Sequence, residues 1–515
     1  MIGASRPVPA RSWPALALAA AGLLTLVYAA ASLALPFGWD HGIIASVGSS
    51  YVHGGLPYVD SWDMKGPAAY LPFSLAEFLF GPTMWGIRLV DLAFWSIAGF
   101  VIFARVGALT TRPIGAWAAL ATYLWIASAG WFFTAAPESW VTTSLIVAFT
   151  PLLAAERTAA RTCAMAGFFI ACAGLVKPFY FTFGLIPLAV CALAPGAGWK
   201  HRAALASALA LGAAIPPALI GGYFALRGGL PQLIEVHLLY PLTTYLDAAS
   251  GWNVAMHGVA ASLLRTPVIC AALLALGTLP NWRAQWRPLA ILAAWFAIAL
   301  FCVVIQKKYY TYHWFPAYPP LFIAAALGLH ALSSGRSGHR LYPAAALALA
   351  GIALVATAAR PLRDAGRLAW YRLAERAPDR YYAAYSFRLY DSADEMAAAR
   401  YIAAHTAPQD GVYVWGSDAT VAYLADRPDP ARFTFAMPLA MPGQYRAAYR
   451  DQAARQLALH PPVYFVSGIS WDGLARASDS LADFPWMAGF LARNYRLEKS
   501  FGVIDLYRLK DRPRP

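Results

Sequence analysis

Long apolar runs constrain this chain more than any other feature of its sequence. The stretches 13–35 and 341–358 contain no charged side chain. As helices, both are long enough to cross about 30 Å of hydrocarbon. Charged residues make up only 13% of the 515 residues, whereas about 25% is usual in soluble domains. The sequence therefore predicts a polytopic α-helical membrane protein and excludes the soluble classes.

Hydropathy predicts about eleven membrane spans. They cover residues 13–36, 86–106, 113–132, 138–154, 162–176, 179–195, 203–225, 259–279, 288–305, 315–333 and 341–358. The first run is long for the apolar part of a signal peptide, and no clear cleavage site follows it, so we interpret it as a retained span. The five cysteines lie in or beside these runs and predict neither disulfides nor a metal site.

Basic residues mark alternate connections between the spans. They are Arg6 and Arg11, Arg105 and Arg112, Arg157 and Arg161, Lys200 and Arg202, Arg283 and Arg287, and Arg336 and Arg340. The positive-inside rule makes these connections cytoplasmic. The N-terminus is then cytoplasmic, and the loops 37–85, 226–258 and 306–314 are extracytoplasmic, as is the C-terminal segment. This topology explains most of the formal charge of +14 without a nucleic-acid partner.

The composition changes near residue 360, which predicts a membrane domain over 1–360 and an extracytoplasmic α/β domain over 361–515. Strands are expected at 411–416, 432–436, 463–467 and 503–509, and helices at 393–405, 418–425, 445–459 and 481–494. Ser392 and Glu395 predict a capping box at the first helix. No glycine-rich nucleotide motif is present, so we interpret this domain as structural or acceptor-guiding.

The first extracytoplasmic loop, 37–85, concentrates the charged residues that can carry chemistry. They are Asp40, His41, His53, Asp60, Asp63 and Lys65. Turns at 54–57 and 66–67 would fold the loop back on itself, so that several charges converge. From spacing alone, ordinary solvated loop charges are the alternative interpretation.

A family resemblance favours a site. The stretch 54–67, GGLPYVDSWDMKGP, resembles the GG-x-PY-x-D-x-x-D-x-K-PP loop of bacterial membrane glycosyltransferases of the GT-C class. These are relatives of dolichyl-phosphate-mannose protein mannosyltransferases and of the aminoarabinose transferase that acts on lipid A. Weaker matches occur at 137–138, 174–177 and 309–313. The chain departs from the family at Asp40-His41, where many relatives have Asp-Glu, and at Gly66, which replaces a proline.

The resemblance implies a GT-C fold and an inverting transfer of sugar from a polyprenyl phosphate. The acceptor would be an envelope glycan, lipid A or a protein on the outer face of a bacterial inner membrane. The departing phosphate is a weak base, so no strong general acid is required. The reaction does need a carboxylate to remove the acceptor proton and cations to meet the phosphate charge.

These requirements assign roles to specific residues. Asp40 is the expected base, and Asp63 would orient Lys65. The expected phosphate-binding residues are Lys65, Lys177, Lys307, Lys308, Tyr310 and His313, and the expected sugar- or acceptor-binding residues are His41, Tyr58, Asp60 and Glu138. No stretch has the ligand spacing of a strong zinc motif, although Asp63 with His41, His53 or His313 leaves a divalent metal open.

Two other classes of membrane protein compete with this interpretation. A transporter or flippase of lipid-linked sugars would also have about eleven spans, but such proteins favour internal repeats and ionisable residues at the membrane midplane. An O-antigen ligase or polymerase would be expected to carry its large external loop between late spans. Here the motif follows the first span, which favours the glycosyltransferase.

Overall fold

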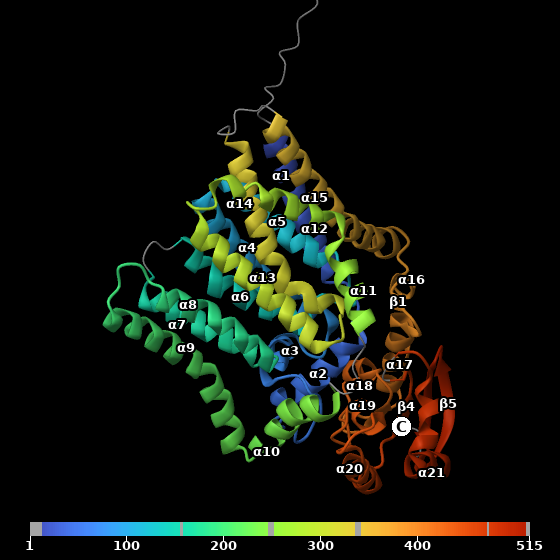
Figure 1. The fold of residues 1–515 in the computed structure, drawn as a ribbon. Coiled ribbons are helices and arrows are strands. Elements are labelled where there is room, and N and C mark those ends of the chain that lie inside the picture. Colours follow the sequence, from blue (N-terminus) through green and yellow to red (C-terminus); the bar gives the residue numbers. More distant parts are fainter. Residues whose placement is uncertain (1–12, 155–157, 246–251, 335–340, 471–472, 511–515) are drawn as a thin grey trace, which may run out of the picture.

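The computed structural model describes residues 13–154, 158–245, 252–334, 341–470 and 473–510. Five residues used above to orient the chain, Arg6, Arg11, Arg157, Arg336 and Arg340, lie outside these ranges. Figure 1 shows a bundle of helices with a small mixed domain, coloured orange to red, at the end opposite the start of α1.

The bundle contains most of the apolar helices. They are α1 (Trp13–Ser32), α4 (Met84–Leu109), α5 (Arg112–Ala127), α6 (Pro137–Ala154), α7 (Ala160–Gly174), α8 (Leu185–Ala192), α9 (Trp199–Leu226), α11 (Trp252–Leu263), α12 (Thr266–Leu276), α13 (Trp286–Gln306), α14 (Tyr318–Ser333) and α15 (Leu341–Arg367). Short 3-10 segments, Pro178–Gly184 and Thr311–Ala317, precede α8 and α14.

All eleven predicted spans contain helix. Within the described ranges, six helices are long and apolar enough to cross a membrane, or seven if the bent pair α11 and α12 forms one broken span. The pair is bent by 72°. The helical membrane architecture is therefore confirmed, whereas the number of crossings remains a prediction.

The predicted first external loop is largely helical. It contains α2 (Trp39–Val52) and α3 (Pro67–Phe80), which pack against each other. Gly54 turns the chain between them with a φ of 78°, a conformation that glycine adopts without strain. The turn expected at Gly66-Pro67 is instead the start of α3, because proline suits the first helical position, where no N–H is needed.

The later loop that we predicted to be external, 226–258, holds α10 (Leu230–Leu233) and two π-helical turns, Ile234–Leu239 and Pro241–Tyr245. A further π-helical turn, Leu368–Ala374, continues directly from α15.

The C-terminal domain carries a four-stranded sheet in the order β3-β4-β6-β5. The strands are β3 (Val412–Trp415), β4 (Tyr464–Ser467), β5 (Tyr495–Phe501) and β6 (Ile504–Leu509). β3 and β4 are parallel and the other pairs antiparallel. A two-stranded ribbon pairs β1 (Ser386–Phe387) with β2 (Tyr390–Asp391). The helices are α16 (Pro378–Ala383), α17 (Ser392–Ala404), α18 (Ala419–Leu424), α19 (Met437–Ala440), α20 (Arg446–Leu459) and α21 (Pro485–Asn494).

Two details of the domain differ from the sequence predictions. Residues 432–436 form no strand, because the carbonyl of Arg432 accepts from the backbone N–H of Trp62 and the N–H of Ala436 donates to the carbonyl of Gly416. The N-cap of α17 is Asp391, whose carboxylate accepts from the backbone N–H of Ala393 at 2.8 Å. Glu395 is turned away from the cap and accepts from the hydroxyl of Tyr390, so the capping box is wrong.

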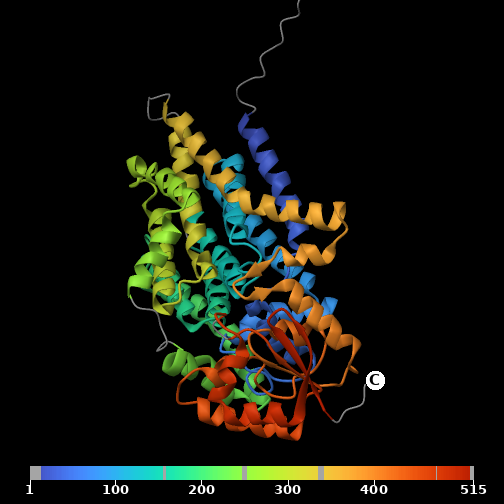
Figure 2. The ribbon, with the colours of Figure 1, turned by 90° about the vertical axis from the view of Figure 1, so that its right-hand side faces the viewer.

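The C-terminal domain lies directly against α2 (Figure 2). Gly42 of α2 faces Thr420 of α18 so closely that an added Cβ would lie 2.3 Å from the Thr420 hydroxyl. Trp62 donates its backbone N–H to the carbonyl of Arg432 at 2.7 Å, and the Thr434 hydroxyl donates to the carbonyl of Trp62 at 3.3 Å. These contacts tie the segment around Asp63 to the C-terminal domain.

Candidate active site

The first turn of α2 presents Asp40 and is locked by the residue that follows it. His41 accepts from the backbone N–H of Gly38 through Nδ1 at 2.9 Å. Its Nε2 therefore carries the proton and donates to the carbonyl of Thr134 at 2.7 Å. Burial, with the nearby Arg88 guanidinium, lowers the pKa of His41 to about 3, so the ring is neutral. Both ring nitrogens are occupied, and His41 therefore positions Asp40 rather than offering a free group to a sugar.

Arg88 of α4 reinforces the same junction. Its Nη1 donates to the Thr134 carbonyl at 3.0 Å, and its Nη2 donates to the carbonyls of Pro36 and Trp131 at 2.6 and 2.8 Å. This buried cation satisfies carbonyls at the end of α1 and between α5 and α6. The start of α2 is consequently held on two sides.

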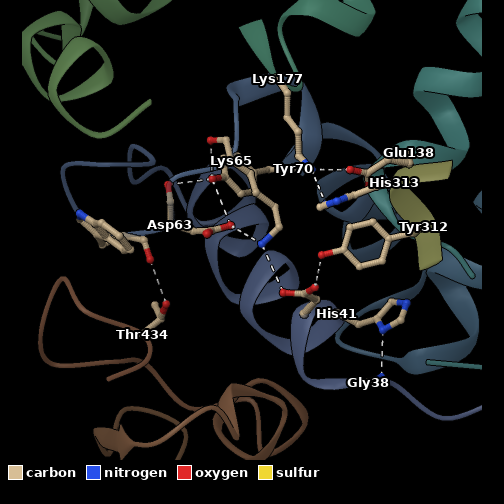
Figure 3. Close-up of polar contacts among 12 residues, drawn as sticks. Gly38, His41, Asp63, Lys65, Tyr70, Glu138, Lys177, Tyr312, His313 and Thr434 are labelled. Atoms are coloured by element: carbon tan, nitrogen blue, oxygen red, sulfur yellow. Dashed lines mark hydrogen bonds and ion pairs between the residues drawn. The ribbon is translucent and has the colours of Figure 1, made fainter. Parts of the chain in front are cut away.

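Lys65 lies between two carboxylates at the centre of the site (Figure 3). Its Nζ is 3.4 Å from Oδ1 of Asp40 and 3.3 Å from Oδ2 of Asp63. The hydroxyl of Tyr312, which precedes α14, donates to Oδ2 of Asp40 at 3.1 Å. The fold thus brings together the expected base, the expected phosphate-binding cation and a tyrosine some 270 residues away.

The two carboxylates differ in their environments. The Asp40 side chain is 27% exposed, whereas that of Asp63 is 1% exposed. Burial raises the pKa of both, but at Asp40 the Lys65 ammonium and the Tyr312 hydroxyl outweigh burial, and its pKa lies below its usual value. The pKa of Asp63 stays raised, because burial and the charge of Asp40 exceed the attraction of Lys65. Asp40 is therefore a partly exposed, ionised carboxylate, whereas Asp63 is a buried carboxylate that contacts Lys65.

Lys65 remains a cation in this setting. Burial alone would lower its pKa, but the adjacent Asp40 and Asp63 carboxylates raise it above its usual value. A permanent positive charge at this position can stabilise a departing phosphate.

Tyrosine and aspartate side chains hold the loop in shape. Tyr58, at a φ of 70°, donates its hydroxyl to the Lys65 carbonyl at 2.7 Å. The hydroxyl of Tyr70 lies 2.7 Å from the same carbonyl and 2.9 Å from that of Asp63. Asp60 accepts from the backbone N–H of Leu56 at 2.7 Å. The structure therefore places Tyr58 and Asp60, which we expected near the sugar, in the scaffold of the loop.

A second polar cluster lies beside the first and centres on Lys177 (Figure 3). Its Nζ is 2.5 Å from Oε1 of Glu138, 2.8 Å from Oε1 of Gln306 and 3.2 Å from Nε2 of His313. The same ammonium lies 5.6 Å from the ring centroid of Tyr312, which joins the two clusters. Three of the expected site residues thus converge. Gln306 was missed, although a polar residue that ends an apolar run is a usable signal.

Lys307, Lys308 and Tyr310 lie at the edge of these clusters. Lys307 ends α13 in a left-handed conformation with a φ of 51°. The Nζ of Lys308 lies 4.4 Å from the ring centroid of Tyr245. The ring of Tyr310 lies 5.3 Å from that of His313, and the residue is 44% exposed. Their role in phosphate binding therefore remains a prediction.

The parts of the chain that the structure describes contain no cluster of side chains that could hold a metal ion. No three His, Cys, Asp or Glu side chains there converge on one point. His41 contacts backbone, His53 contacts Ser49 and Glu77, and His313 contacts Lys177. The three histidines considered for a divalent metal therefore lie in separate contacts.

Comparison with known proteins gives structural matches alone. No protein-family model and no curated protein matches this sequence. The chain is similar to ArnT from Cupriavidus metallidurans in the apo state, with a TM-score of 0.59 and 14% identity over 97% of this chain and 98% of that chain. The same protein bound to undecaprenyl phosphate matches with a TM-score of 0.54 at equal identity and coverage.

AglB from Archaeoglobus fulgidus, in complex with an inhibitory peptide and a dolichol phosphate, matches with 13% identity over 98% of this chain and 75% of that chain. Its TM-score of 0.44 is too low to support an argument. The two ArnT matches confirm the predicted fold, a helical membrane region with a C-terminal α/β domain, over nearly the whole chain. At this identity they concern the fold alone.

Proposed function

We propose that this protein is an inverting glycosyltransferase that moves a sugar from a polyprenyl phosphate to an acceptor in the cell envelope. The observation that carries the proposal is the position of Lys65 between Asp40 and Asp63, with the Tyr312 hydroxyl donating to Asp40. A cation for the leaving phosphate and a carboxylate for the attacking hydroxyl are thus adjacent.

The proposed reaction is a single displacement. The acceptor hydroxyl attacks the anomeric carbon, its proton passes to Asp40, and the bond from that carbon to the phosphate oxygen breaks. The negative charge on the released polyprenyl phosphate is met by Lys65, with Lys177 beside it. Donor binding also prepares the base: a phosphate that draws Lys65 away from Asp40 makes that carboxylate more basic.

The fold match supports the donor class. ArnT has been crystallised with undecaprenyl phosphate, so a protein of this fold binds a polyprenyl phosphate. The loop motif supports the same donor independently. We further propose an inner-membrane location in a bacterium, with the N-terminus cytoplasmic and the C-terminal domain periplasmic. The acceptor would be an envelope glycan, a lipid such as lipid A, or a protein.

A transfer assay tests the proposal. Purified protein in liposomes is supplied with a panel of radiolabelled polyprenyl-phosphate sugars and an envelope extract, and wild type is compared with Asp40→Asn. Label should reach an acceptor with wild type and with the matched control Asp60→Asn, whose amide oxygen can still accept from Leu56. Absence of transfer from every donor would refute the proposal and direct attention to flux of lipid-linked sugar.

A further inference from the structure

A pocket of about 590 Å³, with mostly polar lining residues, lies between α20 and the segment before α11, outside the site described above. This volume matches a small-ligand site. The polar residues that line it are Glu235, Arg432, Tyr449, Gln452, Arg455 and Gln456. Gln452, Arg455 and Leu459 follow one another at helical spacing and share one face of α20. Figure 1 shows α20 at the end of the molecule opposite the start of α1.

The groups available in this pocket are mainly hydrogen-bond donors. Gln452 accepts from Nη1 of Arg432 at 3.1 Å, and Gln456 accepts from the backbone N–H of Arg432 at 3.1 Å. Since both amide oxygens are occupied, the two NH₂ groups are left to donate. Arg455 is exposed and can only donate.

Arg432 itself is buried at 6% exposure, yet its Nε has no hydrogen-bond partner among the described residues. A buried guanidinium N–H without an acceptor is costly. Its Nη2 is 3.6 Å from Oε1 of Glu235, and that oxygen also accepts from the Tyr449 hydroxyl at 2.8 Å. The charge of Glu235 is therefore neutralised, and Arg455 leaves the pocket with a net positive charge.

We propose that this pocket binds an anionic sugar unit of the acceptor, through its carboxylate or phosphate group. A donor-rich, positively charged pocket selects a ligand that presents acceptors and negative charge, and planar Arg and Gln groups suit the oxygens of a sugar. That the ligand is a sugar rests on the proposed function, since a glycosyltransferase that extends a glycan must hold that glycan.

The pocket adjoins the catalytic loop. Arg432 lines the pocket with its side chain, and its carbonyl accepts from the N–H of Trp62, the residue before Asp63. The rings of Trp62 and Tyr449 lie 5.9 Å apart. A glycan bound here would therefore contact Arg432 and Tyr449, and both of these residues contact Trp62 beside Asp63.

Binding measurements on the full-length protein in detergent test this inference. They need no sugar donor and do not depend on a transfer reaction. The probes are trigalacturonate, glucose 6-phosphate, neutral maltotriose and inorganic phosphate, titrated by calorimetry. We expect trigalacturonate, glucose 6-phosphate or both to bind, at least about tenfold more tightly than maltotriose and than inorganic phosphate. Arg455→Ala and Gln452→Ala should each weaken that binding about tenfold, whereas Arg496→Ala, an exposed arginine on edge strand β5, should not.

Several outcomes would overturn the proposal. These are no binding of either anionic sugar, equal binding of maltotriose, equal binding of inorganic phosphate, or affinity unchanged in both pocket variants. If the anionic sugars bind and the pocket variants weaken that binding, but no transfer is found, the pocket proposal stands and the proposed glycosyltransferase activity is refuted. Where transfer is found, Arg455→Ala should raise KM for an anionic acceptor and leave KM for the donor unchanged.

Discussion

Replacing Lys65 with methionine removes the cation that lies between Asp40 and Asp63 while keeping most of the side-chain volume. At 3.4 and 3.3 Å, each ion pair is worth roughly 5 kcal/mol at an effective dielectric constant of about 20. Desolvation offsets part of this, and breaking a buried pair typically costs about 3–5 kcal/mol. We expect a loss of that size in the free energy of unfolding at pH 8.

The loss should depend on pH. Without Lys65, the main influence that opposes the effect of burial on the pKa of Asp63 is lost, so this pKa rises further above its value in the unfolded chain. A carboxyl whose folded pKa is raised costs no stability below its unfolded pKa, and the penalty then grows by about 1.4 kcal/mol per pH unit until the folded pKa is reached. The part of the loss that arises from Asp63 is therefore at most about 1.5 kcal/mol at pH 5.

Unfolding of the purified protein by titration with SDS, followed by tryptophan fluorescence at pH 5 and pH 8, measures this difference. The double variant Lys65→Met/Asp63→Asn should recover most of the stability at pH 8, because it no longer buries an unpaired carboxylate. Both variants should lack transfer activity, since the cation for the phosphate is gone. An equal loss at both pH values, or no recovery in the double variant, would refute this account of the site.

Three further changes probe individual contacts. Asp40→Asn should lower kcat by about 10²- to 10⁴-fold in the transfer assay, whereas Asp60→Asn should stay near wild type. Tyr312→Phe removes a hydrogen bond that lowers the pKa of Asp40, so the acid limb of the kcat/KM profile should move to higher pH, by at most about one unit; an unmoved limb would contradict this. Glu138→Gln breaks a buried ion pair and should cost about 3 kcal/mol in the SDS titration, whereas Glu375→Gln, at an exposed pair, should cost less than about 1 kcal/mol; equal losses would contradict this ranking.

The C-terminal domain shows which local sequence signals are sufficient to predict a strand. The strands at 412–415 and 464–467 are fully buried, and in the strand at 504–509 buried and half-buried residues alternate; all three strands were predicted. β5 was missed because it is an edge strand whose side chains are mostly exposed, so its sequence reads as polar and irregular. The expected strand at 432–436 failed for the opposite reason: its backbone is used by Trp62 and by Gly416 instead of a neighbouring strand.

In the loop 37–85, too, the sequence predicted some features and missed others. The charged residues of the loop predicted that Lys65, Asp40 and Asp63 belong to one site, and the structure places the ammonium of Lys65 within 3.4 Å of both carboxylates. The two helices within the loop were not expected. The helix α2 is short and rich in glycine and serine, so it depends on contacts with α3 and α18 for its stability.

By itself, the sequence determined that this chain is a helical membrane protein with a small C-terminal α/β domain, because apolar run length and composition are local properties that hydrocarbon and water sort directly. It also marked the loop that carries the site. Only the tertiary structure decided which carboxylate is partly exposed, that Tyr312 donates to Asp40, and that the carbonyl of Arg432 accepts from Trp62. Exposure, pKa and contact across hundreds of residues arise from packing, which no local pattern specifies.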